Sequence, residues 1–388
     1  MILICPDLMD KPLSQSIVNS MVKPLLSCGP VAMNRYEVIP QLKTIKTFQD
    51  WVDVWTKMAD YASKQEQYLH AAYYYTMASS FCALDLSLQS SLYESALEDF
   101  YRAFDSFHYK YEMITVPYKH SFLNCIYFKA AEEKCKIIIL CEMDSFSECY
   151  VVSFEPLVKQ GYSLYFLDLP GQGGTPERGL YADLRPEDAV SALLTTKHID
   201  ECCIIGVQGG SMAATCCCTT DKRVKQLILY NPVYSKSEFL AGYISPEQRK
   251  KYIFFTKLPL QCHLNMLMKQ LIKTNVIISV ISSSLFRSFH ADDHKELMNI
   301  VSKMTIKGKS EYITQDVLMI SQNSSNSILQ EHFERQKKEI INAKSLKCIS
   351  IDSKDQNDYD VDKYGYMQKS VEYIQQWLDS LFTPSSTL

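Results

Sequence analysis

The sequence predicts an α/β fold built on a mostly parallel sheet, and three observations carry this prediction. Short apolar runs alternate with helix-length segments of mixed polarity between positions 136 and 232, as in buried parallel strands of βαβ units. Eight of the 12 glycines fall between Gly161 and Gly210, so tight turns concentrate in the same stretch. The segment 202–211 reads as a strand, a sharp glycine turn and a helix start made of small residues.

The chain before this stretch is expected to be helical. Prolines recur through positions 1–43, which excludes a long helix and favours a wrapping arm with short helical pieces. From Thr47, apolar residues recur every three or four positions, and two further helices are predicted over 68–84 and 91–107. We therefore expect an N-terminal arm over 1–46, a helical module over 47–110 that caps the sheet, and an α/β core over 111–382 before a tail over 383–388.

The elements of the core are predicted in order. A hairpin of strands 112–117 and 122–128 leads into parallel strands at 136–140, 162–167, 202–205 and 224–230. Helices are expected over 258–272 and 293–304, two late strands over 316–320 and 346–351, and a closing amphipathic helix over 367–381. Nothing in the sequence repeats internally.

Composition excludes several classes of partner. A net charge of −4 with scattered lysines and arginines offers no bulk attraction to nucleic acid or to an anionic membrane. No apolar run reaches about 18 residues, so no membrane-spanning helix is expected. We expect a small-molecule ligand or substrate, no nucleic acid and no membrane as partners, and dimerisation through the N-terminal arm and helices is plausible.

The 14 cysteines do not form the spacing of a disulfide framework or of a zinc site. The residues after Met1 do not form a positively charged segment followed by an apolar run of about 7–15 residues, so a signal peptide is not expected. The cysteines are therefore interpreted as free thiols in a reducing compartment, and the protein as cytoplasmic. No metal and no cofactor is expected.

Several turns in this order resemble one family. They are D-L-P-G-Q-G at 168–173, the elbow at 206–210 and D-K-R-V at 221–224. Over roughly positions 47–381 the chain resembles the α/β-hydrolase superfamily. With its helical module it is similar to the branch of the fermentation–respiration switch protein, dihydroxypseudooxynicotine hydrolase and the fungal hydrolases that shorten polyketides. The resemblance implies a hydrophobic ketonic or polyketide-like ligand and a role in secondary metabolism.

The same resemblance implies that the catalytic triad is degenerate. The nucleophile of a G-x-S-x-G elbow falls on Gln208, the acid in the loop 321–326 with Ser324 as the matching position, and the histidine on Asp360. The loop that supplies oxyanion donors reads Cys141-Glu142-Met143-Asp144 where relatives have two glycines before Leu-Asp. An amide cannot act as an alkoxide nucleophile, so acyl-enzyme chemistry is not expected.

Our leading hypothesis is an atypical, non-hydrolytic enzyme of the lyase, cyclase or acid–base type. Gln208 would act as an amide donor and acceptor, Asp360 or Asp358 as a base, and Glu142 and Asp144 would stand at the oxyanion loop. For most of the acidic loop 355–362, a solvated surface loop is the simpler interpretation. The expected substrate-binding residues lie around the same pocket: Cys141, Gly209, Ser211 and Ser324.

Two alternatives remain open. The first is an inactive pseudo-hydrolase that binds a ligand or a partner, since fold alone does not settle function. The second is a C–C or ester hydrolase that uses Ser211, three positions beyond the elbow centre. A small residue packing the helix against the strand is the simpler interpretation of Ser211, and His332, the only base to propose for it, is expected on the surface of a helix.

Overall fold

The computed structural model describes residues 9–10, 12–80, 82, 86–143, 145–256, 262–322, 327–351 and 365–382. The chain divides into two compact units. The first contains the chain up to Lys110, the stretch Ile272–Ser284 and the first turn of the last helix. The second contains Tyr111–Leu271, Leu285–Gln356 and the remainder of that helix.

The N-terminal part of the first unit is helical, as expected. Three short helices occupy the proline-rich arm and three longer ones follow it: α1 (Gln15–Met21), α2 (Lys23–Ser27), α3 (Arg35–Leu42), α4 (Phe48–Lys64), α5 (Tyr68–Ser80) and α6 (Leu86–Ser106). Helix α4 begins after Thr47 because a capping box closes its first turn. The Thr47 hydroxyl accepts from the Asp50 amide and the Asp50 carboxylate accepts from the Thr47 amide.

Aromatic packing holds α4 against α5. The rings of Trp51 and Trp55 lie 5.5 Å apart, and Trp55 lies 5.4 Å from the ring of Tyr74 on α5. The indole N–H of Trp51 donates to the carbonyl of Met77 at 2.8 Å, which satisfies its one polar group. These side chains are buried, so the helical unit has a core of its own.

The second unit is built on an eight-stranded sheet with the order β1-β2-β4-β3-β5-β6-β7-β8. The β1–β2 hairpin and the β2–β4 pair are antiparallel, and every other neighbouring pair is parallel. The predicted strands are confirmed: β1 (Tyr111–Tyr118), β2 (Ser121–Phe128), β3 (Cys135–Leu140), β4 (Tyr162–Leu167), β5 (Cys202–Val207), β6 (Val224–Tyr230), β7 (Asp316–Gln322) and β8 (Ser345–Ile351).

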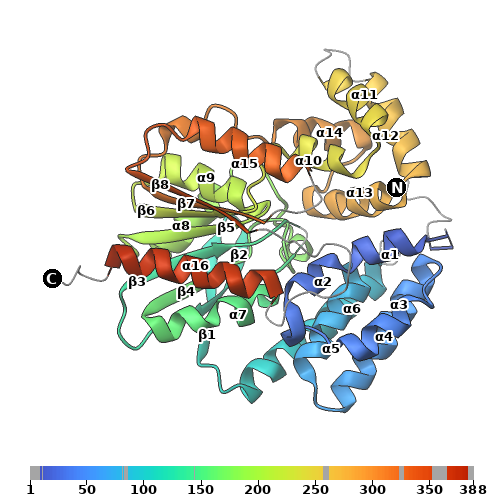
Figure 1. Ribbon diagram of the computed structural model, residues 1–388, viewed down its shortest axis with the longest axis horizontal. Coiled ribbons are helices and arrows are strands. Elements are labelled where there is room, and N and C mark those ends of the chain that lie inside the picture. The colour runs from blue at the N-terminus through green and yellow to red at the C-terminus, as the bar shows by residue number, and fades with distance from the viewer. Residues whose placement is uncertain are drawn as a thin grey trace. The chain divides into compact units, whose positions relative to one another are not determined.

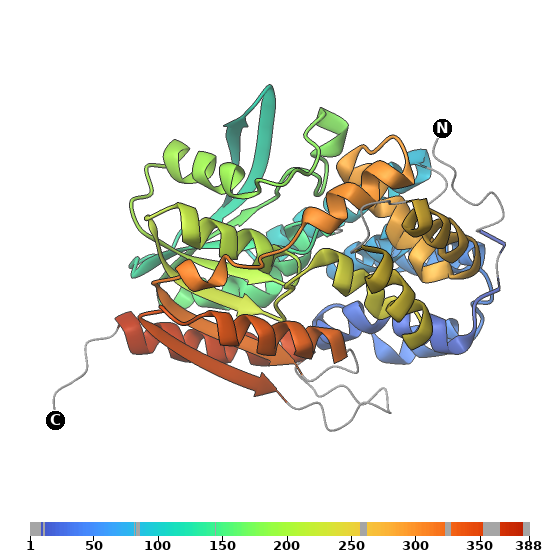
Figure 2. The same ribbon diagram turned by 90° about the horizontal axis from the view of Figure 1, so that it is seen from above.

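Helices cover both faces of this sheet (Figure 1). One face carries α8 (Glu187–Thr196), α9 (Gly210–Thr220) and α15 (Ser327–Glu339), whose apolar side chains join the strands in one buried cluster. The other face carries α7 (Glu148–Phe154), where Phe154 packs on Phe166 of β4, and α16 (Gly365–Phe382). Figure 2 shows the β1–β2 hairpin and β8 at opposite edges of the sheet.

The segment between β6 and β7 is largely helical. It contains α10 (Lys236–Leu240), α11 (Pro246–Thr256), α12 (Cys262–Thr274), α13 (Val276–Phe289) and α14 (His294–Lys303). The part of the expected helix 258–272 that precedes Cys262 lies outside the described residues. Short 3-10 turns complete the fold: η1 (Gly29–Val31), η2 (Glu155–Gln160), η3 (Pro176–Arg178), η4 (Ala241–Tyr243) and η5 (Ser310–Tyr312). Among the helices described, none has the length and apolar character that crossing a bilayer requires.

Candidate functional site

The turn between β5 and α9 is built as a nucleophile elbow with glutamine at its tip. Gln208 has φ +48°, in the left-handed region that side chains other than glycine rarely adopt. The backbone amide of Gln208 donates to the Tyr230 carbonyl at 2.8 Å. Its backbone carbonyl accepts from the Ser211 amide at 2.9 Å, in the first turn of α9. The strained backbone that presents a nucleophile in this kind of turn is therefore present, and it presents an amide side chain.

The glycines around Gln208 are required by close packing. A Cβ on Gly206 would lie 2.5 Å from Ser211 Cα, and one on Gly210 would lie 2.2 Å from the carbonyl oxygen of Leu140. A Cβ on Gly209 would meet the carboxylate of Glu142 at 2.4 Å. The first two let α9 approach β5 and β3, whereas the third leaves room for a side chain from another loop.

Glu142, in the loop after β3, fills the space beside Gly209. One carboxylate oxygen accepts from the Gly209 amide at 2.7 Å. The other accepts from the Met143 amide at 3.1 Å and from the ammonium of Lys236 at 3.0 Å. Glu142 and Lys236 are 7% and 4% exposed, so this is a buried ion pair in which both carboxylate oxygens have donors.

The environment keeps Glu142 ionised. Burial by itself would raise the pKa of Glu142, but the Lys236 ammonium and the two backbone amides outweigh it and hold this pKa below its usual range. In this fold the amide after the nucleophile and an amide of the loop after β3 form the oxyanion hole. In this chain Gly209 follows the elbow residue and Met143 lies in the loop after β3, and the amides of both donate to Glu142.

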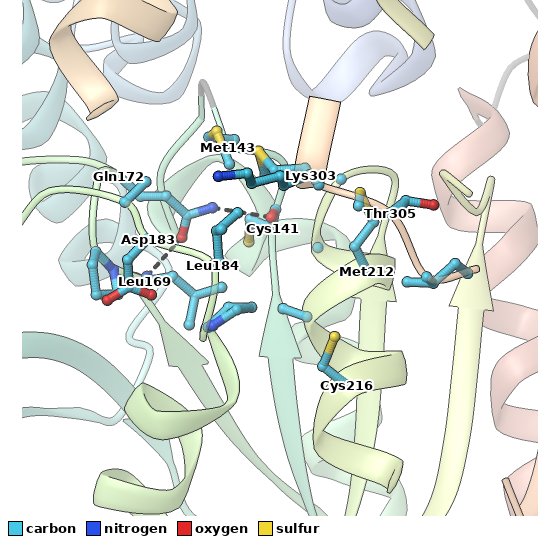
Figure 3. A pocket seen from close by; sticks show the side chains of 18 of the residues that line it. Cys141, Met143, Leu169, Gln172, Asp183, Leu184, Met212, Cys216, Lys303 and Thr305 are labelled. Atoms are coloured by element: carbon cyan, nitrogen blue, oxygen red, sulfur yellow. Dashed lines mark hydrogen bonds between the residues drawn. The ribbon is translucent and has the colours of Figure 1, made fainter. Parts of the chain in front are cut away.

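Gln172 holds the loop of Glu142 in place. Its side-chain amide donates to the carbonyls of Cys141 and Glu142 at 3.0 and 2.8 Å, and its carbonyl accepts from the Leu169 amide at 2.7 Å. The dashed lines of Figure 3 mark two of these bonds. Gln172 is 3% exposed. It therefore ties the turn after β4 to the loop after β3, and the sequence analysis assigned it no role beyond its place in the turn.

Asp168, at the end of β4, is a second buried carboxylate beside this loop. It accepts from the Ser147 amide at 2.9 Å and from the Ser147 hydroxyl at 2.7 Å. Burial raises the pKa of Asp168 to about 6, because these two hydrogen bonds offset only part of the cost of removing the charge from water. Asp168 thus changes charge in mildly acidic solution.

A pocket opens at the carboxyl ends of β3, β4 and β5, where open α/β sheets place ligands. Its walls come from four places: the strand ends with Cys141, Met143, Leu169, Gln172 and Gly209, the segment 182–186 before α8, helix α9 with Met212 and Cys216, and the segment 303–309. Figure 3 shows these side chains around the pocket. The cavity offers about 70 Å³ to the centres of water molecules, which is room for several waters or a small organic group.

The predicted site residues divide into three groups. Cys141 and Gly209 line the pocket, whereas Gln208 is half-buried beside it and Glu142 lies behind Gly209. Ser211 is fully buried and its hydroxyl accepts from the Val233 amide at 2.9 Å, so it packs α9 and does not line the pocket. Three predicted residues lie outside the described part of the chain: Asp144, Ser324 and Asp360 (and, with them, Asp358).

The expected exposure of His332 is wrong. Helix α15 buries this imidazole to 1% exposure against Tyr234, and its Nε2 lies 3.3 Å from a carboxylate oxygen of Glu238 on α10. The same carboxylate pairs with Arg335 at 2.9 Å. His332 is therefore part of the packing between α10 and α15. The position that helical periodicity assigned to solvent is covered by a helix distant in sequence.

The described cysteines are free, and their thiols stay protonated where they face the pocket. Burial raises the pKa of Cys141 well above its usual value. Burial also raises the pKa of Cys216, although the Lys309 ammonium, 3.0 Å from its sulfur, opposes the shift. Within the described residues no group of three or more His, Cys, Asp or Glu is placed to hold a metal ion.

Comparison with known proteins identifies the fold. No family model matches the sequence, and no curated protein matches it. Among solved structures, 2,6-dihydroxy-pseudo-oxynicotine hydrolase is similar over 92% of this chain and 95% of its own, with a TM-score of 0.61 and 12% identity. AbyA5 is similar over 86% and 87%, with the same TM-score and identity.

A bacterial membrane phospholipase A, described as a virulence factor, is similar over 76% of this chain and 92% of its own, with a TM-score of 0.50 and 14% identity. Together with the sheet order and the elbow, these neighbours show that the chain has the α/β-hydrolase fold. Identities this low carry the fold alone, so activity has to be argued from the site.

Proposed function

We propose that this α/β-hydrolase-fold protein is non-hydrolytic and binds a small molecule in the pocket at the ends of β3, β4 and β5. The occupation of the oxyanion hole carries the proposal. The Gly209 and Met143 amides both donate to Glu142, which is ionised and paired with Lys236.

Acyl transfer has no place to stabilise its charge in this arrangement. A tetrahedral intermediate carries a negative oxygen that must sit between the two donor amides. Here that position holds a carboxylate, and a second negative charge at hydrogen-bond distance from it is strongly unfavourable in a buried site. Gln208 offers no hydroxyl to form the intermediate, and the hydroxyl of Ser211 is buried in a bond to the Val233 amide.

Acid–base catalysis by Glu142 is also disfavoured. A general base works best with a pKa near the working pH, whereas the pKa of Glu142 is lowered and its oxygens accept from three donors. The other carboxylates of our leading hypothesis from the sequence, Asp144, Asp358 and Asp360, lie outside the described residues. The described residues favour the binding alternative. A ketonic or polyketide-like ligand would place its apolar portion against the apolar walls of this pocket.

The proposal is tested with a fluorophosphonate probe and a panel of short-chain aryl esters. Purified protein should remain unlabelled and should not turn over the esters, with a serine esterase run alongside as the positive control. Ser211→Ala is the matched variant. Labelling of the wild-type chain that disappears in Ser211→Ala would identify a hydrolase with an offset nucleophile and would overturn the proposal.

A further inference from the structure

Two ammonium groups stand in the wall of an otherwise apolar pocket. Lys303 ends α14 and Lys309 follows it in the same wall segment, and both line the pocket with Leu169, Met212 and Ile306. In Figure 3 the Lys303 side chain extends across the view towards Gln172 and Met143. A cavity with apolar walls and two cations differs from the cavity expected for a neutral ketone.

Most of the negative charges nearby are paired. Among the described residues, Asp183 is the one carboxylate in the lining and pairs with Lys119 at 2.6 Å, and Glu142 pairs with Lys236. Glu187 does not line the pocket, but its charge acts on Lys309, and one of its carboxylate oxygens is buried without a hydrogen-bond partner among the described residues. Within the described part of the chain, neither Lys303 nor Lys309 has a carboxylate oxygen within ion-pair distance. Among the described lining residues, the two lysines are therefore in excess over the one carboxylate, which is itself paired with Lys119.

Lys309 is held at the wall in its charged form. Its ammonium donates to the Cys216 sulfur at 3.0 Å, and an ammonium group has three N–H donors in all. Burial alone would lower the pKa of Lys309, but the Cys216 sulfur and the charge of Glu187 raise it above its usual value. A half-buried cation with donors to spare, fixed by one weak acceptor, is suited to bind an anion.

We infer that the pocket binds a small organic anion, a carboxylate with a short apolar body, whose charged group lies against Lys309 and Lys303. The apolar part would lie on Leu169, Met212 and Ile306. This inference rests on the proposed non-hydrolytic binding function. In an ester hydrolase, an acid in this pocket would be the reaction product and would have to be released.

The test compares acids with neutral analogues of the same shape. Dissociation constants of benzoate and benzamide, and of butyrate and butyramide, are measured by ligand-observed NMR at low ionic strength. Each acid should bind at least about tenfold more tightly than its amide, because an ammonium forms stronger hydrogen bonds with a charged acceptor than with a neutral one. Added salt should weaken the acids more than the amides.

Substitutions at three lysines locate the charged group. Lys309→Met should weaken binding of the acids about tenfold to a hundredfold and leave the amides unchanged, and Lys309→Arg, which keeps the charge, should restore most of the affinity. Lys303→Met should give a smaller loss, because Lys303 is exposed. Lys307→Met is the control, since Lys307 lies between these two lysines in sequence, is exposed and does not line the pocket.

The possible failures are distinguishable. Equal affinity for acid and amide, or acid binding that Lys309→Met leaves unchanged, would overturn the anion assignment while the non-hydrolytic binding function stands. Absence of binding by either acid would overturn it as well. Fluorophosphonate labelling, measured separately, reports on the proposed function whatever the lysine variants show.

Discussion

Replacement of Glu142 by alanine tests the central feature of the site, the carboxylate in the oxyanion hole. Glu142→Ala removes the partner of the Lys236 ammonium, whose side chain is 5% exposed, and leaves two backbone amides without an acceptor. Removing one member of a buried ion pair costs about 3–5 kcal/mol, because the remaining charge is uncompensated. We expect a loss of unfolding free energy of that size.

Two companion variants separate the lost charge from the lost packing. In the double variant Glu142→Ala/Lys236→Met neither charge of the pair remains, so it should be more stable than Glu142→Ala alone. If the two substitutions acted independently, the double variant would instead be less stable than either single variant. Glu201→Ala is the matched control, because its pair with Lys225 spans 3.4 Å between side chains that are 72% and 44% exposed. Such a surface pair contributes about 1 kcal/mol or less.

Urea unfolding measures the free energies, and hydrogen exchange of peptides from β3 and β5 reports on the sheet unit by itself. Added formate should raise the stability of Glu142→Ala more than that of the wild-type protein, because the vacated space is lined by two amide donors and an ammonium. The reasoning is refuted if Glu142→Ala costs no more than Glu201→Ala, or if the losses in the double variant simply add.

Two further predictions concern the same region. The buried Asp168 carboxyl binds its proton more tightly in the folded chain than in the unfolded one, because burial raises its pKa to about 6. Its contribution to stability is therefore present below pH 4 and is lost as the pH rises through about 6. The free energy of urea unfolding should fall with pH across this range, and Asp168→Asn should remove that fall. Gly210→Ala should abolish or severely reduce soluble folded protein, because its Cβ would lie 2.2 Å from a backbone oxygen of β3. Gly308→Ala is the control: its φ is +70° and the space around it is open, so it should cost only about 1 kcal/mol of backbone strain. Comparable stability of the two variants by circular dichroism would contradict this.

Local signals in the sequence were sufficient for the strands and the elbow. Short apolar runs placed β3 to β6 correctly, and the glycine spacing placed the elbow at Gln208, whose φ of +48° the structure then shows. The simpler interpretation of Ser211, a small residue that packs the helix start, agrees with its burial. These features depend on residues within a few positions of one another, where periodicity and turn chemistry act.

The chemistry of the site depends on residues distant in sequence. Glu142 was placed near the oxyanion loop as a candidate acid or base, and its partner Lys236 lies 94 positions away with no motif around it. Without that ammonium a carboxylate beside the elbow reads as a catalytic group, and with it the same carboxylate is a fixed structural anion. His332 was misplaced for a similar reason, because α10 covers a helix face that its own sequence marks as polar.

If the protein is non-hydrolytic as proposed, the carboxylate of Glu142 makes esterase chemistry difficult to acquire by mutation. A serine at position 208 would form a tetrahedral intermediate whose negative oxygen lies against the Glu142 carboxylate. Loss of Glu142 on its own would leave the buried Lys236 ammonium without its partner. Either substitution alone is therefore inactive or destabilising, so a change to a hydrolase requires both substitutions at once. We expect that a library of all single substitutions of this chain contains no active esterase.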